Sequence, residues 1–120
     1  MREPLRDIER LRHILEAISN IETASDGITK DELEKNFILR HALTWNVMII
    51  GEAANKITKE FCAEHPVNPW RSIAGMRHVL VHDYYKIDVD ELWDVITADL
   101  PDLKSQIAGY IKELSGHKLT

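Results

Sequence analysis

The sequence predicts an all-α protein, an antiparallel bundle of four to five helices. Apolar residues recur at steps of three and four over most of the chain, which is the spacing of one face of a helix. Five glycines and four prolines occur among 120 residues, which is few for an all-β chain rich in turns. This length, with 44% hydrophobic residues, predicts a single helical domain over residues 1–120.

The first helix is predicted over residues 5–24. Its apolar stripe repeats every three or four residues and consists of Ile8, Leu11, Leu15 and Ile18. Gly27 follows the helix, as glycine commonly does at a helix end. Thr29 and Glu32 then have the spacing of a capping box, which predicts a short helix or turn reaching about Asn36.

The second long helix is predicted over residues 39–64. Its seam repeats at steps of four and three, which suits antiparallel bundle packing, and consists of Leu43, Val47, Ile50, Ala54, Ile57 and Phe61. Trp45, Met48 and Ile49 are apolar but lie off this seam. We therefore expect the helix to bury more than one face, either in the bundle centre or against a second subunit.

Residues 66–69, with the sequence Pro-Val-Asn-Pro, break the helical pattern and start a third helix. We expect that helix to end near Tyr84 or Tyr85. A fourth helix is predicted from after Asp88 to about residue 114. Because Pro101 falls inside its pattern, we expect a kink near Leu100 or two helices in tandem.

The predicted third helix carries an unusual set of polar side chains. On an ideal helix Arg77 lies within the apolar arc with Tyr84, while His78, His82 and Tyr85 share its flank. A core helix with a snorkelling arginine and surface histidines would give this pattern. The other interpretation is an interface or pocket in which Arg77 meets an acidic or phosphate partner.

Glu52 lies in the middle of the second long helix among apolar residues. One interpretation is that Glu52 is a partner for Arg77. The other, nearly as good, is that it is a solvated glutamate on the surface.

A metal site is the weaker interpretation of the paired histidines. His78 and His82 are four residues apart, which permits chelation from a helix. No glutamate follows the first histidine in the manner of the HExxH motif, and the sequence offers no third ligand. The acidic residues from Asp88 to Asp94 fit the negatively charged start of a helix. We predict no metal and no cofactor.

Charge and cysteine content restrict the function and the compartment. The net charge of −5 argues against a broad basic surface for duplex DNA, although a local phosphate site is compatible with it. Cys62 is the single cysteine, so no internal disulfide forms and a cytoplasmic location is expected. A small helix residue is a better interpretation of Cys62 than a nucleophile. We expect no signal peptide and no contact with a membrane.

The most specific pattern is Arg77-x4-His82-x-Tyr84. With its flanking blocks, residues 50–54, Trp70, residues 75–78 and residues 92–101, it resembles the RX4HXY motif of HEPN-domain proteins of the HepT-like toxin family. The resemblance covers nearly the whole chain. It implies a helical bundle that forms a homodimer and acts as a metal-independent RNA endonuclease.

The resemblance also implies roles for individual residues. Arg77 and His82 correspond to the catalytic pair, which meets its copies across the dimer axis. We assign supporting or substrate-binding roles to His78, Asp83 and Glu52. Tyr84 corresponds to the tyrosine to which a cognate antitoxin, a minimal nucleotidyltransferase, adds AMP from ATP. The chain is thus similar to the toxin of a two-gene toxin–antitoxin module.

Two other classes of function remain open from the sequence. One is a non-catalytic helical dimer that binds a nucleotidyltransferase partner together with nucleotide or nucleic acid. The other is a helical protein with a bound metal.

Overall fold

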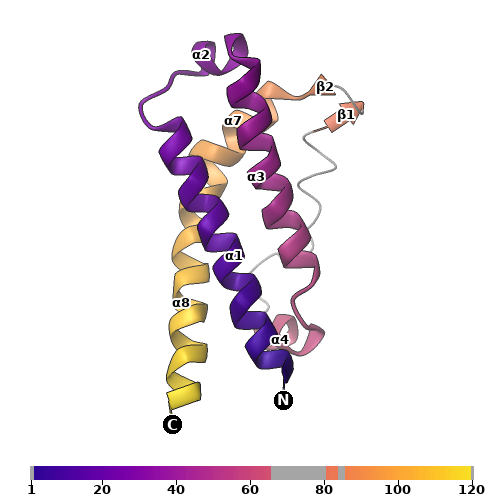
Figure 1. Cartoon of the computed structure of the whole chain (residues 1–120), viewed down its shortest axis with the longest axis vertical. Helices are drawn as coiled ribbons and strands as arrows, with labels where there is room; N and C mark the ends of the chain where they lie inside the picture. The colour runs from indigo at the N-terminus through magenta and orange to yellow at the C-terminus, as the bar shows by residue number, and fades with distance from the viewer. Residues whose placement is uncertain (1, 66–80, 84–85, 120) are drawn as a thin grey trace.

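A computed structural model of the chain describes residues 2–65, 81–83 and 86–119, with side chains for residues 6–65 and 87–116. Its longest helices are α1 (Arg2–Ser25), α3 (Phe37–Asn55) and α8 (Leu100–Leu119). Helix α1 packs against both α3 and α8 (Figure 1). The predicted all-α class is confirmed.

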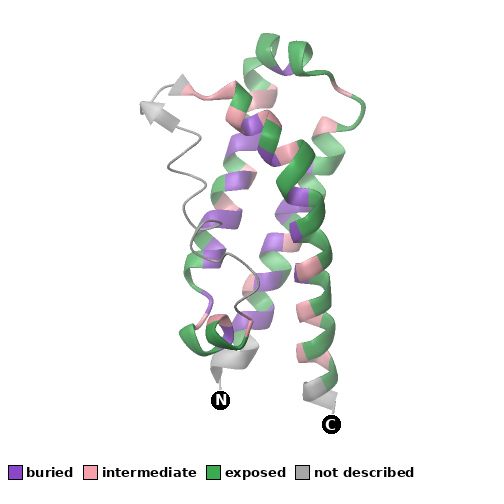
Figure 2. Cartoon of the chain, turned by 180° about the vertical axis from the view of Figure 1, so that it is seen from behind, coloured by how far each residue is buried: buried purple, intermediate pink, exposed green. Residues whose placement is uncertain are grey.

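The core lies between these three helices. Figure 2 shows buried residues along the long helices and exposed residues on their outer sides. The predicted seam of the second long helix is buried in full, from Leu43 to Phe61. In α1, Ile14 is fully buried whereas Leu15 of the predicted stripe is only half-buried.

Side-chain caps begin the short helix α2 (Lys30–Lys35) and then α3. The predicted capping box is present: Thr29 Oγ1 accepts from the Glu32 N–H over 3.1 Å, and Glu32 Oε1 accepts from the Thr29 N–H over 2.8 Å. Asn36 ends α2 and caps α3, since its Oδ1 accepts from the Leu39 N–H over 3.0 Å. These local bonds satisfy N–H groups that have no partner inside a helix.

The predicted helix over residues 39–64 is divided in two. Helix α3 ends at Asn55, and α4 (Lys59–Glu64) begins after Thr58, whose side chain caps it by accepting from the Phe61 N–H. Asp7 of α1 stabilises this break. Asp7 is 3% exposed, and its carboxylate accepts from the Thr58 N–H over 2.9 Å and from the Thr58 hydroxyl over 2.7 Å.

The prediction of a helix reaching Tyr84 or Tyr85 is wrong over Val81–Asp83. These residues form strand β1 (Val81–Asp83), which pairs antiparallel with β2 (Lys86–Ile87) (Figure 1). Val81 and Ile87 are Cα partners in this pair. Both are β-branched, and such residues favour strands over helices.

The predicted interruption before Pro101 is confirmed. Helix α7 (Val89–Asp94) starts at the Asp88 cap and is followed by the π-helical segment η1 (Val95–Asp99), which leads into α8. The Leu100 N–H donates to the Val95 carbonyl, five residues back. Proline has no N–H with which to continue the regular pattern, and a π-turn accommodates that loss.

Among the described residues, no helix has both the length and the apolar character needed to cross a membrane.

We predict that Asp7→Ala lowers the free energy of unfolding by about 2 kcal/mol. The substitution removes the acceptor of two hydrogen bonds to a charged group and leaves the Thr58 N–H unsatisfied. Urea unfolding measures the change, with Glu9→Ala, at an exposed position of the same helix, as the control. Equal losses in the two variants would contradict a role for Asp7 in holding the turn.

Candidate functional site

The residues that the sequence singled out fall mostly outside the described side chains. Arg77, His78 and Tyr84 lie outside the described residues altogether. His82 and Asp83 belong to the backbone of β1, and their side chains are outside the described set.

Glu52 is the predicted site residue whose side chain is described. It lies on α3 and is exposed. Glu52 lines a groove of about 400 Å³ between α1 and α3, which we call the α1–α3 groove. The lining residues come from two helices and are Arg10, His13, Glu16, Ala17, Asn20, Asn46, Ile49, Glu52, Ala53 and Lys56.

Two contacts between α1 and the other wall of the groove show how the two helices run relative to each other. Asp7 meets Thr58 near one end of the α1–α3 pair. Asn20 meets Asn46 at the other end, where Asn20 Nδ2 donates to Asn46 Oδ1 over 3.3 Å. The helices therefore run antiparallel, and the cationic residues of the groove gather toward the Asp7 end.

The kind of side chain that lines the groove changes along its length. Arg10 and Lys56 bring positive charge to the end near Asp7. Ala17, Ala53 and Ile49 supply an apolar surface along its middle. The amide side chains of Asn20 and Asn46 lie at the end far from Asp7. The groove thus combines a short apolar surface with a majority of polar and charged lining residues.

Within the described residues, the side chains of Arg10, His13, Glu16 and Lys56 make no recorded hydrogen bond or ion pair. Arg10 is half-buried, and the other three are exposed. Their charged and polar groups are therefore open to a ligand. None of the four was predicted as a site residue; the signal that the sequence does hold is the spacing of Arg10 and His13, which places them on one side of a helix.

A second feature of α3 is an exposed apolar surface. Phe37 is 58% exposed, Ile38 68%, Trp45 64% and Met48 36%; we call these four residues the α3 stripe. Trp45, Met48 and Ile49 were expected to be buried, either in the bundle centre or against a second subunit. Ile49 is half-buried and packs against the core, whereas Trp45 and Met48 are exposed within the chain, so burial in the bundle centre is wrong for these two.

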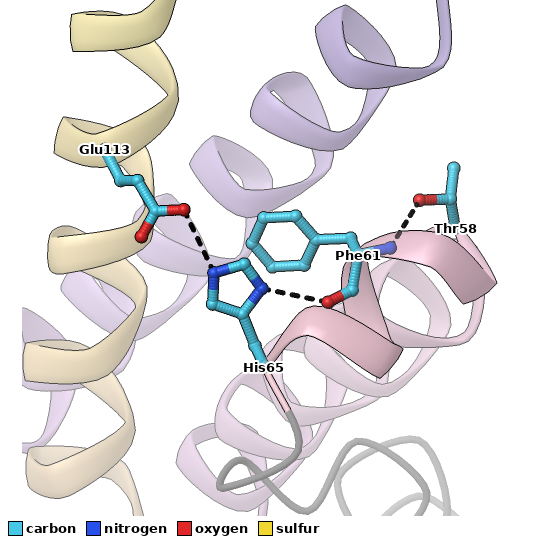
Figure 3. A network of polar contacts seen from close by, with 4 residues as sticks. All are labelled: Thr58, Phe61, His65 and Glu113. Atoms are coloured by element: carbon cyan, nitrogen blue, oxygen red, sulfur yellow. Dashed lines mark hydrogen bonds and ion pairs between the residues drawn. The ribbon is translucent and has the colours of Figure 1, made fainter.

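His65 connects α4 to α8 (Figure 3). Its Nδ1 lies 2.9 Å from the Phe61 carbonyl, and its Nε2 lies 3.1 Å from Oε2 of Glu113. The ring also stacks on that of Phe61, with centroids 4.0 Å apart, and meets the Tyr110 ring edge-on. These contacts hold two helices together at one end of the bundle, which indicates a structural role for His65.

Cys62 is half-buried on α4. Burial, with the nearby Asp7 carboxylate, raises the pKa of its thiol. A thiol with a raised pKa stays protonated near neutral pH and is a poor nucleophile. This agrees with the interpretation of Cys62 as a small helix residue.

No cluster of three or more potential metal-binding side chains (His, Cys, Asp or Glu) occurs among the residues that the structure describes. The side chains of His78 and His82 lie outside the described residues.

Comparisons with known proteins give a consistent result. The chain is 34% identical over 97 residues to a protein of Caldanaerobacter subterraneus subsp. tengcongensis named "Putative RNase", which covers 81% of this chain and 87% of that one. It is also 36% identical over 96 residues to a "Probable ribonuclease HepT" of Thermococcus cleftensis. This match covers 80% of this chain and 87% of the relative.

A longer relative comes from Methanocaldococcus jannaschii and is named "Gamma-glutamylcyclotransferase and putative RNase". It is 34% identical over 108 residues, and the match spans 90% of this chain but 49% of the relative. No solved structure gives a significant match.

The model of one protein family, described as "Ribonuclease HepT-like", matches residues 14–109. That range contains Glu52 and the whole Arg77-x4-His82-x-Tyr84 pattern. The chain therefore belongs to the HepT-like ribonuclease family.

Proposed function

We propose that the chain is a metal-independent RNA endonuclease and the toxin of a toxin–antitoxin module. The observation that carries the proposal is the family match, which spans the Arg77-x4-His82-x-Tyr84 pattern. The names of the relatives, which are RNases or a ribonuclease HepT, support the activity.

The proposed chemistry uses the nucleophile that RNA itself carries. The ribose 2′-OH lies next to each scissile phosphate. His82 takes its proton or gives one to the leaving 5′-oxygen, and Arg77 stabilises the charge that builds on phosphorus. The bond from phosphorus to the 5′-oxygen breaks as the bond to the 2′-oxygen forms. A 2′,3′-cyclic phosphate results, and DNA is resistant because it lacks the 2′-OH.

We predict that the purified protein cleaves RNA in the presence of EDTA, and that His82→Ala slows cleavage about a hundredfold or more. Arg77→Ala is expected to act in the same direction, whereas the control His117→Ala keeps the rate of the unmodified chain. Gel analysis of labelled RNA measures the rates, and mass spectrometry identifies the cyclic phosphate. Wild-type cleavage that His82→Ala leaves unchanged would remove Arg77 and His82 from the mechanism.

We propose further that the active form is a homodimer in which two copies of the catalytic pair share one cleft. The α3 stripe supports a second copy as the partner, since monomeric proteins rarely expose adjoining large apolar side chains. In a twofold dimer the same surface of each copy meets the other, so a stripe on one helix is sufficient to form a self-complementary interface.

The dimer predicts a clear effect of Trp45→Glu. A charge placed at the centre of an apolar interface is costly to bury, so this variant should run as a single chain. Light scattering coupled to size-exclusion chromatography gives the mass. Ala108→Glu, at an exposed position of α8, is the control and should stay dimeric. A dimer that survives Trp45→Glu would place the interface elsewhere.

The proposed antitoxin is a minimal nucleotidyltransferase that adds AMP from ATP to Tyr84. The tyrosine oxygen attacks the α-phosphorus of ATP, and pyrophosphate leaves. The bulky anionic group then opposes the RNA phosphates in the cleft, which is how an added phosphate commonly acts as a switch.

We predict that incubation with the cognate nucleotidyltransferase and ATP adds AMP to Tyr84 and abolishes RNA cleavage. Peptide mass spectrometry locates the modification. The Tyr84→Phe variant should escape it, whereas Tyr85→Phe should not, which separates two adjacent tyrosines. Modification only at other residues would reject Tyr84 as the acceptor.

The second candidate function is a non-catalytic dimer that binds the nucleotidyltransferase and nucleotide or nucleic acid. The net charge of −5 favours it, because an acidic chain has little general affinity for RNA. This candidate fails if Arg77→Ala and His82→Ala lose cleavage but keep the dimer and the partner.

A further inference from the structure

We propose that the α1–α3 groove binds one adenine ribonucleotide. Its phosphate lies at the end formed by Arg10 and Lys56, its ribose beside Glu16, and its base at the amides of Asn20 and Asn46. The ligand is either a free nucleotide or one residue of an RNA chain. Only the RNA source rests on the proposed ribonuclease function.

The groove has the size of this ligand. Its volume of about 400 Å³ lies within the range of small-molecule sites. From Arg10 to Asn20 the α1 backbone rises roughly 15 Å at the usual rise per residue. A nucleotide in extended form fits this length, so one ligand reaches both the cationic end and the amides.

The N–H donors at the Asp7 end suit a phosphate, and Glu52, four residues before Lys56, lines the same groove with a carboxylate. Arg10 offers a planar fork of N–H donors, and Lys56, the C-cap of α3, offers a second cation from the other wall. His13, one turn after Arg10, adds a further donor. Because the described residues give these three side chains no partner of their own, a phosphate need not displace an existing ion pair.

Glu16 gives the groove a means of distinguishing ribose from deoxyribose. Its carboxylate accepts hydrogen bonds only, and ribose hydroxyls donate them. Glu16 lies between the cationic end and the amides along α1, which is where the sugar of a bound nucleotide is expected. The 2′-OH is the group by which proteins distinguish RNA from DNA.

The amide pair at the far end favours adenine. Asn46 Nδ2 donates to the Ala42 carbonyl over 2.9 Å, which fixes the Asn46 amide, and Asn46 in turn accepts from Asn20. Asn20 keeps one N–H and its carbonyl oxygen for a ligand. This donor and acceptor together match the donor and acceptor edge of adenine. The apolar surface of Ala17 and Ile49 contacts the faces of the sugar and base.

The test is calorimetric titration of the full chain with AMP. AMP should bind saturably, and dAMP and inorganic phosphate should bind more weakly. Arg10→Ala and Lys56→Ala should each weaken AMP binding by roughly tenfold, because each loses a charge-assisted contact. Arg12→Ala and Lys59→Ala are the matched controls, at exposed positions outside the groove lining. Absent saturation, or equal affinities in Arg10→Ala and Arg12→Ala, overturns the proposal.

RNA cleavage by the same variants identifies the source of the ligand. A raised KM with unchanged kcat in Arg10→Ala and Lys56→Ala assigns the groove to RNA. Weakened AMP binding with unchanged cleavage assigns it to a free nucleotide. If AMP binds as expected but the wild-type chain cleaves no RNA, the groove assignment holds and the ribonuclease proposal fails. A change in KM without a change in AMP affinity overturns the nucleotide site.

Discussion

The buried carboxylate of Asp7 fixes how α1 lies against α3, and the α1–α3 groove depends on that register. Apolar burial has no direction, so two striped helices can slide along one another at modest cost. A buried carboxylate that has lost water must keep its hydrogen bonds, and here both go to Thr58. The same hydroxyl caps α4, so Thr58 both starts α4 and ties it to α1.

Local patterns in the sequence predict the elements whose causes are local. The capping box at Thr29 and Glu32 needs four consecutive residues, and the interruption before Pro101 follows from one missing N–H. The seam from Leu43 to Phe61 is buried in full because a regular apolar repeat decides which side of the helix faces the bundle. The break at Thr58 has a local part, the Thr58 cap on the Phe61 N–H, which the sequence analysis overlooked, and a long-range part, the contact with Asp7 51 residues earlier, which no local pattern indicates.

The difference between local and long-range causes also decides which parts of the candidate site the sequence predicts. The motif from Arg77 to Tyr84 is short and contiguous, so it is recognised in the sequence without knowledge of the fold. The α1–α3 groove joins Arg10 to Lys56, which are far apart in sequence, and neither is unusual in its own helix. Their proximity exists only once the helices are in register. Glu52 lines the groove, and its predicted pairing with Arg77 stays a prediction.

Helix α3 connects the proposed interface to the proposed ligand site. Residues 45, 49, 52 and 56 follow one another at steps of four, three and four, which places them along one side of the helix. Trp45 belongs to the α3 stripe, and Ile49, Glu52 and Lys56 line the groove. If two copies pair through the stripe, each groove lies at the border of the interface. Arg10 and Lys56, which have no partner among the described residues, then lie near the place where two subunits meet, and a local pair of cations is compatible with a net charge of −5.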